Sequence, residues 1–130
     1  MTVQEWIDGY IRAWEDRDAD AAAELFTEDA EYRDDPFSGP HTGREGVRSY
    51  WSGVTESQSD VHVRFGAPIV AADRAHAAAE FWVNMLNGGA EVTLTGIVYL
   101  RFGDGGLCEE LRETWNFAAG RIDPPAGWGR

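Results

Sequence analysis

Two adjacent carboxylates stand where a short predicted strand gives way to a loop. The strand covers residues 30–33, and Asp34 and Asp35 follow it directly before Pro36. A carboxylate held beside aromatic side chains can take a proton from a bound molecule, so either aspartate is a candidate general base. Aspartate before proline also caps turns, and this structural role stays open for both residues.

A histidine and two glutamates are candidate partners for this pair. His41 lies on the Gly/Pro-rich loop and is the best placed of the three histidines for proton transfer, although a loop histidine is often only solvated. Pairing the later strands through their glycine-rich turns predicts one row of Glu80, Gly96 and Glu113 across the sheet. Two carboxylates over an open glycine would shift each other's pKa. A slip of one residue would send either glutamate to the other face.

Hydrophobic periodicity predicts the elements that position these residues. Apolar residues at helical spacing predict three helices, over residues 2–16, 19–26 and 43–55. Thr2 with Glu5 and Thr42 with Glu45 predict capping boxes at the first and third helices. From residue 60 the period changes to two, which predicts a meander of four strands, over residues 61–65, 75–86, 91–102 and 107–117.

These elements predict an α+β domain over residues 1–117, followed by an extended tail over residues 118–130. The expected architecture is a cone-shaped α+β barrel with three N-terminal helices packed in a strongly curved, mostly antiparallel β-sheet. A sheet curled over helices leaves a conical cavity, and six Trp, six Phe and four Tyr supply aromatic walls. The side chains expected to line it are Trp14, Tyr50, Trp51, Trp82, Asn84, Gly96, Val98, Leu111 and Trp115.

Composition excludes several classes of partner. The 130 residues hold 23 acidic side chains against 11 arginines, a formal net charge of −12, which argues against nucleic acid and against an anionic membrane surface. The single cysteine, Cys108, cannot form an internal disulfide, and neither a metal-ligand spacing nor a glycine-rich phosphate loop occurs, so neither metal nor cofactor is expected. No signal peptide or long apolar run is present, which predicts a cytoplasmic protein.

Several short segments follow a pattern shared with one superfamily. They are Trp14 with Arg17-Asp18, Leu25-Phe26-Thr27-Glu28-Asp29-Ala30, Gly43-Arg44-Glu45, Leu100-Arg101-Phe102 before Gly-Asp-Gly, and Leu111-Arg112-Glu113-Thr114-Trp115. Through them, residues 3–117 resemble the nuclear-transport-factor-2-like superfamily, in particular its SnoaL-like (polyketide cyclase) and ketosteroid-isomerase branches. The resemblance implies the fold strongly, whereas this fold hosts many activities.

The resemblance also implies roles for single residues. Tyr10 falls where the isomerases place an oxyanion-hole tyrosine, Asp34 or Asp35 falls where they place the general base, and Trp115 matches a pocket tryptophan. Val98 stands where they need a second oxyanion donor, and it can donate nothing. Loss of such a donor typically costs about a hundredfold or more in rate, which argues against steroid isomerisation.

The tyrosines that usually support the helix-one tyrosine are also expected to be absent, because Phe26 and Trp51 stand at roughly those positions. The reading that remains is general acid–base chemistry on a small hydrophobic, polyketide- or steroid-like molecule. Asp34 or Asp35 is the expected base, and the acid or orienting group comes from a set of Tyr10, His41, Glu80 and Glu113.

Two other readings use the same fold. A binding or accessory protein would keep the pocket without turnover. A homodimer would form through the outer sheet face, whose expected residues are Thr93, Thr95, Ile97 and Tyr99.

Overall fold

The computed structural model describes the whole chain, residues 1–130. Three helices precede or interrupt a seven-stranded sheet, and none of the helices is long and apolar enough to cross a membrane. In chain order the elements are α1 (Val3–Glu15), α2 (Ala19–Ala23), β1 (Phe26–Arg33), β2 (His41–Thr42), α3 (Gly43–Thr55), β3 (Gln58–Phe65), β4 (Ile69–Val70), β5 (His76–Asn87), β6 (Ala90–Phe102) and β7 (Cys108–Ala119).

The helix boundaries follow local capping chemistry, with one exception. Thr2 forms the predicted capping box with Glu5 at the start of α1. The box predicted at α3 is wrong, because the Thr42 side chain caps nothing and Glu45 instead pairs with Arg48. α2 ends at Ala23 rather than near residue 26, because the chain there enters β1 and pairs with β7.

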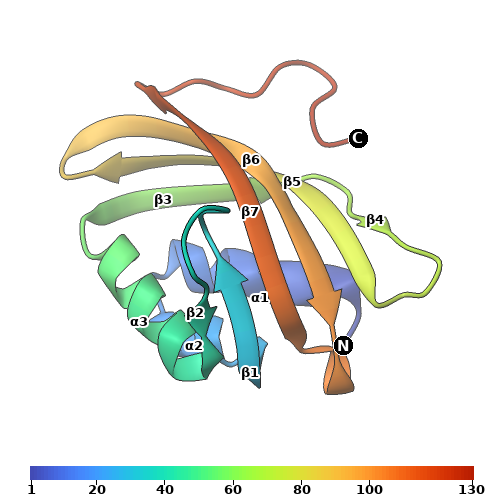
Figure 1. Cartoon of the computed structure of the whole chain (residues 1–130). Coiled ribbons are helices and arrows are strands. Elements are labelled where there is room, and N and C mark those ends of the chain that lie inside the picture. Colours follow the sequence, from blue (N-terminus) through green and yellow to red (C-terminus); the bar gives the residue numbers. More distant parts are fainter.

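The sheet has the strand order β2-β1-β7-β6-β5-β3, and β4 adds to β5. Its pairs are antiparallel except β1 with β7, which run parallel, so the predicted meander is joined by a strand from the helical half of the chain. Figure 1 shows the strands curving around the helices in an open cone. The predicted α+β cone, mostly antiparallel, is confirmed.

Aromatic side chains fill the interior of this cone. Trp14 and Trp51, expected to line a cavity, are buried and lie edge to face with ring centroids 5.1 Å apart. Val98 and Leu111 are also buried in the same hydrophobic cluster. These four residues therefore form core instead of facing a ligand, because side chains from α1, α3 and the sheet meet in close packing.

The C-terminal segment crosses the outer side of the sheet (Figure 1). The Ile122 carbonyl accepts hydrogen bonds from the Trp82 indole (2.9 Å) and the Asn84 amide (3.0 Å), and the Ile122 amide donates to the Thr93 hydroxyl (3.0 Å). Trp82 and Asn84, predicted to line the cavity, thus face the opposite side and hold the tail. Thr93, expected on a dimer face, is covered by the same segment, since its hydroxyl donates to the Gly120 carbonyl (2.8 Å).

Gly96 is required by the close approach of β6 and β7. A Cβ atom there would lie 1.9 Å from the Thr114 carbonyl oxygen and 2.9 Å from the ring of Phe81. The space next to Gly96 is therefore filled by β7 and Phe81. The prediction that Gly96 leaves an open space between two carboxylates is wrong.

Gly96→Ala should destabilise the fold by about 2–3 kcal/mol, because the backbone of β7 has to shift to admit the methyl group. Urea unfolding measures the loss. Gly53→Ala is the matched control, since nothing lies within 4 Å of its added Cβ on α3, and alanine should stabilise that helix by about 0.5–1 kcal/mol. Equal stability of the Gly96→Ala variant and the wild type would contradict the packing described.

Candidate functional site

A cavity of about 330 Å³ opens at the mouth of the cone, where β1 ends and β7 continues. The side chains around it carry three carboxyl groups and one indole. Its lining residues are Asp34, Asp35, Pro36, Glu113, Thr114 and Trp115. A larger hollow of about 880 Å³ lies between the start of α1 and the segment around β4, but the one charged side chain lining it is Arg74. Acid–base groups therefore gather only at the smaller cavity of the two.

The structure separates the roles of the two adjacent aspartates. Asp34 lies 3.0 Å from Nε2 of His41, and each side chain remains about a third exposed (30% and 36%). Asp35 instead accepts hydrogen bonds from the Phe37 amide (2.8 Å) and the Ser38 hydroxyl (3.3 Å), which is a turn-capping arrangement. Asp34 with His41 can exchange a proton with a bound molecule, whereas Asp35 shapes the loop.

Short strand β2 brings His41 to this position. His41 pairs with Tyr32 of β1, and its ring lies against the ring of Tyr50 on α3, with centroids 4.5 Å apart. Because one face of the imidazole is packed, the ring holds its partner Asp34, which lines the cavity, in a fixed orientation.

Glu113 supplies the second ionisable group of the site. It points inward from β7 opposite Val98, and the hydroxyl of Tyr50 donates to Oε1 at 3.5 Å. Burial of its carboxyl group raises the pKa to about 8, the charge of Asp34 adds to the rise, and the Tyr32 and Tyr50 hydroxyls oppose it. Part of the residue reaches the surface, but the carboxyl itself is enclosed. At neutral pH Glu113 is therefore mainly a protonated acid beside the carboxyl group of Asp34.

Three tyrosines connect this carboxyl to the core. The hydroxyls of Tyr10 and Tyr32 lie 3.0 Å apart, and both residues are buried. The rings of Tyr32 and Tyr50 lie 4.9 Å apart. Burial, followed by the nearby charge of Glu113, raises the pKa of all three, so they stay neutral donors.

The expectation that supporting tyrosines are absent is therefore wrong, because Tyr32 of β1 bonds the Tyr10 hydroxyl and Tyr50 of α3 lies against Tyr32. Tyr32 belongs to the candidate site and was not predicted from sequence. It lies two residues from the buried Ala30 in β1, so its side chain is on the same, inward face of the strand, which was a usable signal. Tyr10, predicted to contact ligand, lies behind Tyr32 and reaches the cavity only through it.

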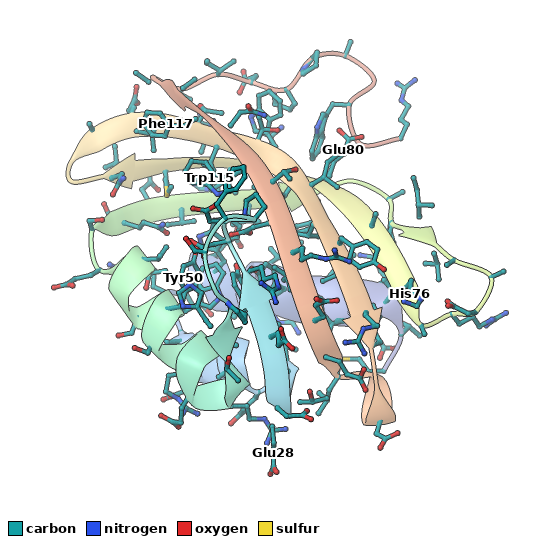
Figure 2. All side chains as sticks on the ribbon, in the orientation of Figure 1. Glu28, Tyr50, His76, Glu80, Trp115 and Phe117 are labelled. Carbon is teal, nitrogen blue, oxygen red and sulfur yellow. The ribbon has the colours of Figure 1, made fainter.

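Glu80 lies outside the site. Figure 2 shows it away from Tyr50 and Trp115, and it is exposed on the outer side of the sheet. The predicted row is wrong, because Glu80 pairs with Ile97 and Gly96 pairs with Trp115. The β5–β6 hairpin closes with a two-residue turn, Gly88-Gly89, both at positive φ, and a register irregularity follows Arg101 before the next turn. As a result, the β5–β6 pairing differs by one residue from the expected register, and the β6–β7 pairing differs by two.

Trp115 forms the apolar wall of the cavity. It is 49% exposed, and its indole donates to the backbone carbonyl of Asp34 (3.3 Å), which ties β7 to the loop. No group of three or more His, Cys, Asp or Glu side chains is arranged to hold a metal ion. The arrangement offers a proton acceptor, a proton donor and a flat apolar surface at one opening.

Comparisons with known proteins agree with this geometry at the level of the fold. A family model described as SnoaL-like domain matches residues 7–110. A search of curated proteins gives no significant match.

Several solved structures have a fold similar to that of this chain. One similar structure is SalBIII, described as an epoxide hydrolase/cyclase-like enzyme in pyran ring formation of the polyether salinomycin, with 21% identity, TM-score 0.78, and coverage of 90% of this chain and 95% of that chain. Another comes from Pseudomonas putida and carries a provisional assignment as a polyketide cyclase (19% identity, TM-score 0.75, coverage 89% and 92%). A third, from Catenulispora acidiphila, has a ketosteroid-isomerase-like fold and was solved with trimethylamine (22% identity, TM-score 0.74, coverage 88% and 86%).

Proposed function

Because the chain belongs to the SnoaL-like domain family, we propose that it is a cofactor-free acid–base catalyst for a small, uncharged, largely apolar molecule. The observation that carries the proposal is the placement of Asp34, which is bonded to His41, and the largely enclosed Glu113 carboxyl around one cavity. Asp34 with His41 is the acceptor, and Glu113, protonated at neutral pH, is the donor. Such pairs of carboxyl groups, pushed apart in pKa by their surroundings, perform acid and base roles in one site.

The reaction class follows from the two roles. The Asp34–His41 pair removes a proton from a carbon next to a carbonyl, or from an attacking hydroxyl group, while Glu113 donates its proton to the oxygen that becomes basic. Ring closure and epoxide opening both need this combination. The similar structures described as a cyclase and as an epoxide hydrolase/cyclase-like enzyme support that range of chemistry.

Charge restricts the ligand. The cavity is lined by carboxyl groups without an arginine, and the chain has a net charge of −12, so an anionic substrate is repelled. Trp115 offers a ring face for the apolar body of the molecule. A neutral polyketide-like or similar ring compound fits these conditions.

A binding-only protein is the alternative, and one observation favours it. Asp34 and His41 are each about a third exposed at an open cavity, where water weakens electrostatic catalysis. Such a protein would hold an apolar ligand against Trp115 and leave it unchanged.

The chromogenic probe 5-nitrobenzisoxazole distinguishes these alternatives without knowledge of the natural substrate. A base removes its ring C–H proton, the N–O bond breaks, and the oxygen leaves as a phenolate that absorbs visible light. The catalyst should accelerate this reaction at least about a hundredfold over an equal concentration of acetate and imidazole, the range expected for a positioned base. Quenching of tryptophan fluorescence by the probe without any acceleration would refute catalysis and leave the binding-only alternative.

A further inference from the structure

The hollow of about 880 Å³ is a second cavity, and it shares no lining residue with the candidate site. It lies between the start of α1, the turn that joins β4 to β5, and the end of β6. Its volume is within the range of small-molecule pockets, about 300–1,000 Å³. Apolar side chains form much of its wall, among them Val3, Pro68, Val70, Ala72 and Phe102. The hollow can therefore hold the apolar body of a small molecule.

Hydrogen bonds and close packing hold the walls of this hollow in place. β4 pairs with β5, and the Phe102 amide donates to the Ala75 carbonyl (2.7 Å), which joins this hairpin to the end of β6. Figure 1 shows the N-terminus beside the turn between β6 and β7. Gly106 of that turn lies so close that an added Cβ would be 2.6 Å from the Met1 carbonyl oxygen. The walls are thus formed by the fold itself, before any ligand binds.

Arg74 is the one charged side chain that lines the hollow, and no carboxylate of the chain neutralises it. None of the ion pairs includes Arg74, although the chain has 23 acidic residues against 11 Arg. The neighbouring Asp73 is engaged elsewhere, because its carboxylate accepts from the Ala75 amide (2.9 Å) and lies 2.6 Å from Nδ1 of His76. The charge of Arg74 is therefore free to pair with a ligand.

The turn holds Arg74 in a conformation that few residues other than glycine adopt. Its φ is 59°, and its amide donates to the Ala71 carbonyl at 2.9 Å. Side chains other than glycine in this region of φ cost free energy, and they cluster at ligand sites, where the surrounding structure imposes the conformation. Arg74 makes no ion pair that would offset this cost within the chain.

From this arrangement we infer that the hollow binds a carboxylate with an apolar body, such as a medium-chain aliphatic acid. The planar guanidinium group of Arg74 matches the two carboxylate oxygens, and the apolar walls remove the hydrocarbon chain from water. The candidate site has the opposite character, because three carboxyl groups and no cation line its cavity. The two cavities thus take different molecules, an uncharged compound at the mouth of the cone and an anion at the hollow.

Sodium octanoate is the probe, followed by NMR amide shifts of the ¹⁵N-labelled chain. The shifts should be confined to residues around the hollow, such as Gln4, Ala72 and Gly103, while the indole signal of Trp115 stays in place. Acetate carries the same charge without the chain and should bind at least about tenfold more weakly, since each fully buried methylene contributes up to about fourfold. Octylammonium should not displace octanoate, although a net charge of −12 attracts a cation.

Arg74→Asn removes the cation and introduces a residue that tolerates positive φ. It should weaken octanoate binding about three- to fivefold, the upper part of the range for exposed ion pairs. Arg64→Asn is the matched control, because Arg64 is exposed on β3, belongs to no ion pair and lies outside the hollow. This variant makes the same change in net charge and should bind octanoate as the wild type does. Both variants should keep the wild-type rate with 5-nitrobenzisoxazole, so the binding result is independent of the proposed catalysis.

Four results would overturn the inference. Absence of any shift at millimolar octanoate would mean that the hollow binds no such molecule, and shifts centred on Asp34 and Trp115 would assign the ligand to the other cavity. Equal affinity for acetate and octanoate would indicate an adventitious ion only. Equal weakening by Arg74→Asn and Arg64→Asn would reduce the effect to the net charge of the chain.

Discussion

Replacing Asp34 by asparagine is expected to lower kcat/KM for 5-nitrobenzisoxazole by about a hundredfold or more, the typical contribution of a positioned general base. Asparagine keeps the shape of the side chain but can neither accept the proton nor balance a positive charge on His41, 3.0 Å away. The melting temperature should hold, because the Asp34 side chain is partly solvated and packs little. Stopped-flow absorbance and a thermal melt make the two measurements.

Asp35→Asn provides the matched control one residue away. Its carboxylate bonds the Phe37 amide and Ser38, and asparagine retains an oxygen for that turn, so the rate should change little. If both variants lose the rate equally, the division between a reactive Asp34 and a structural Asp35 is wrong.

Substituting Glu113 by glutamine should change how both rate and stability depend on pH. In the wild type the rate should fall as pH rises through about 8, because the carboxyl that donates a proton then ionises. Glutamine carries no such proton. The variant should lose about a hundredfold at neutral pH and show no fall near pH 8.

The same pKa shift predicts the sign of a stability change. Folded Glu113 keeps its proton up to about pH 8, whereas in the unfolded chain the carboxyl loses it near 4.5. Between these values the folded state binds more protons, so stability falls as pH rises, by at most about 1.4 kcal/mol per pH unit. This contribution is complete below pH 4.5 and lost through about pH 8.

Urea unfolding at a series of pH values measures the slope. Glu113→Gln should flatten it, and Glu80→Gln, exposed on the outer face, should leave it as in the wild type. A Glu113→Gln variant with the wild-type slope would show that another group binds the proton.

Local patterns predicted much of this fold. α3 covers the predicted residues 43–55, and α1 differs from its prediction only at the ends, since both helices carry strong amphipathic spacing. β1 was predicted four residues too short, because Thr27, Glu28 and Asp29 interrupt its apolar alternation. Its parallel pairing with β7 joins segments about 80 residues apart, which no local pattern can indicate.

The candidate site was predictable residue by residue but not as an arrangement. Asp34, His41 and Glu113 were each identified by type and position. Their convergence depends on the two-residue strand β2 and on the exact register of β7, which turn geometry sets. The same dependence explains why Glu80 was placed on the wrong face.

The protonation state of Glu113 can be measured directly by NMR titration of a sample carrying ¹³C at the glutamate side-chain carboxyl carbons, with Glu113→Gln to assign the resonance. A midpoint near pH 8 is expected, with the resonance of the neutral acid at pH 7. In the Asp34→Asn variant the midpoint should fall, because the neighbouring charge that adds to the shift is gone. A midpoint near 4.5 in the wild type would mean that Glu113 is ionised at neutral pH, and a site built on opposite protonation states would be contradicted.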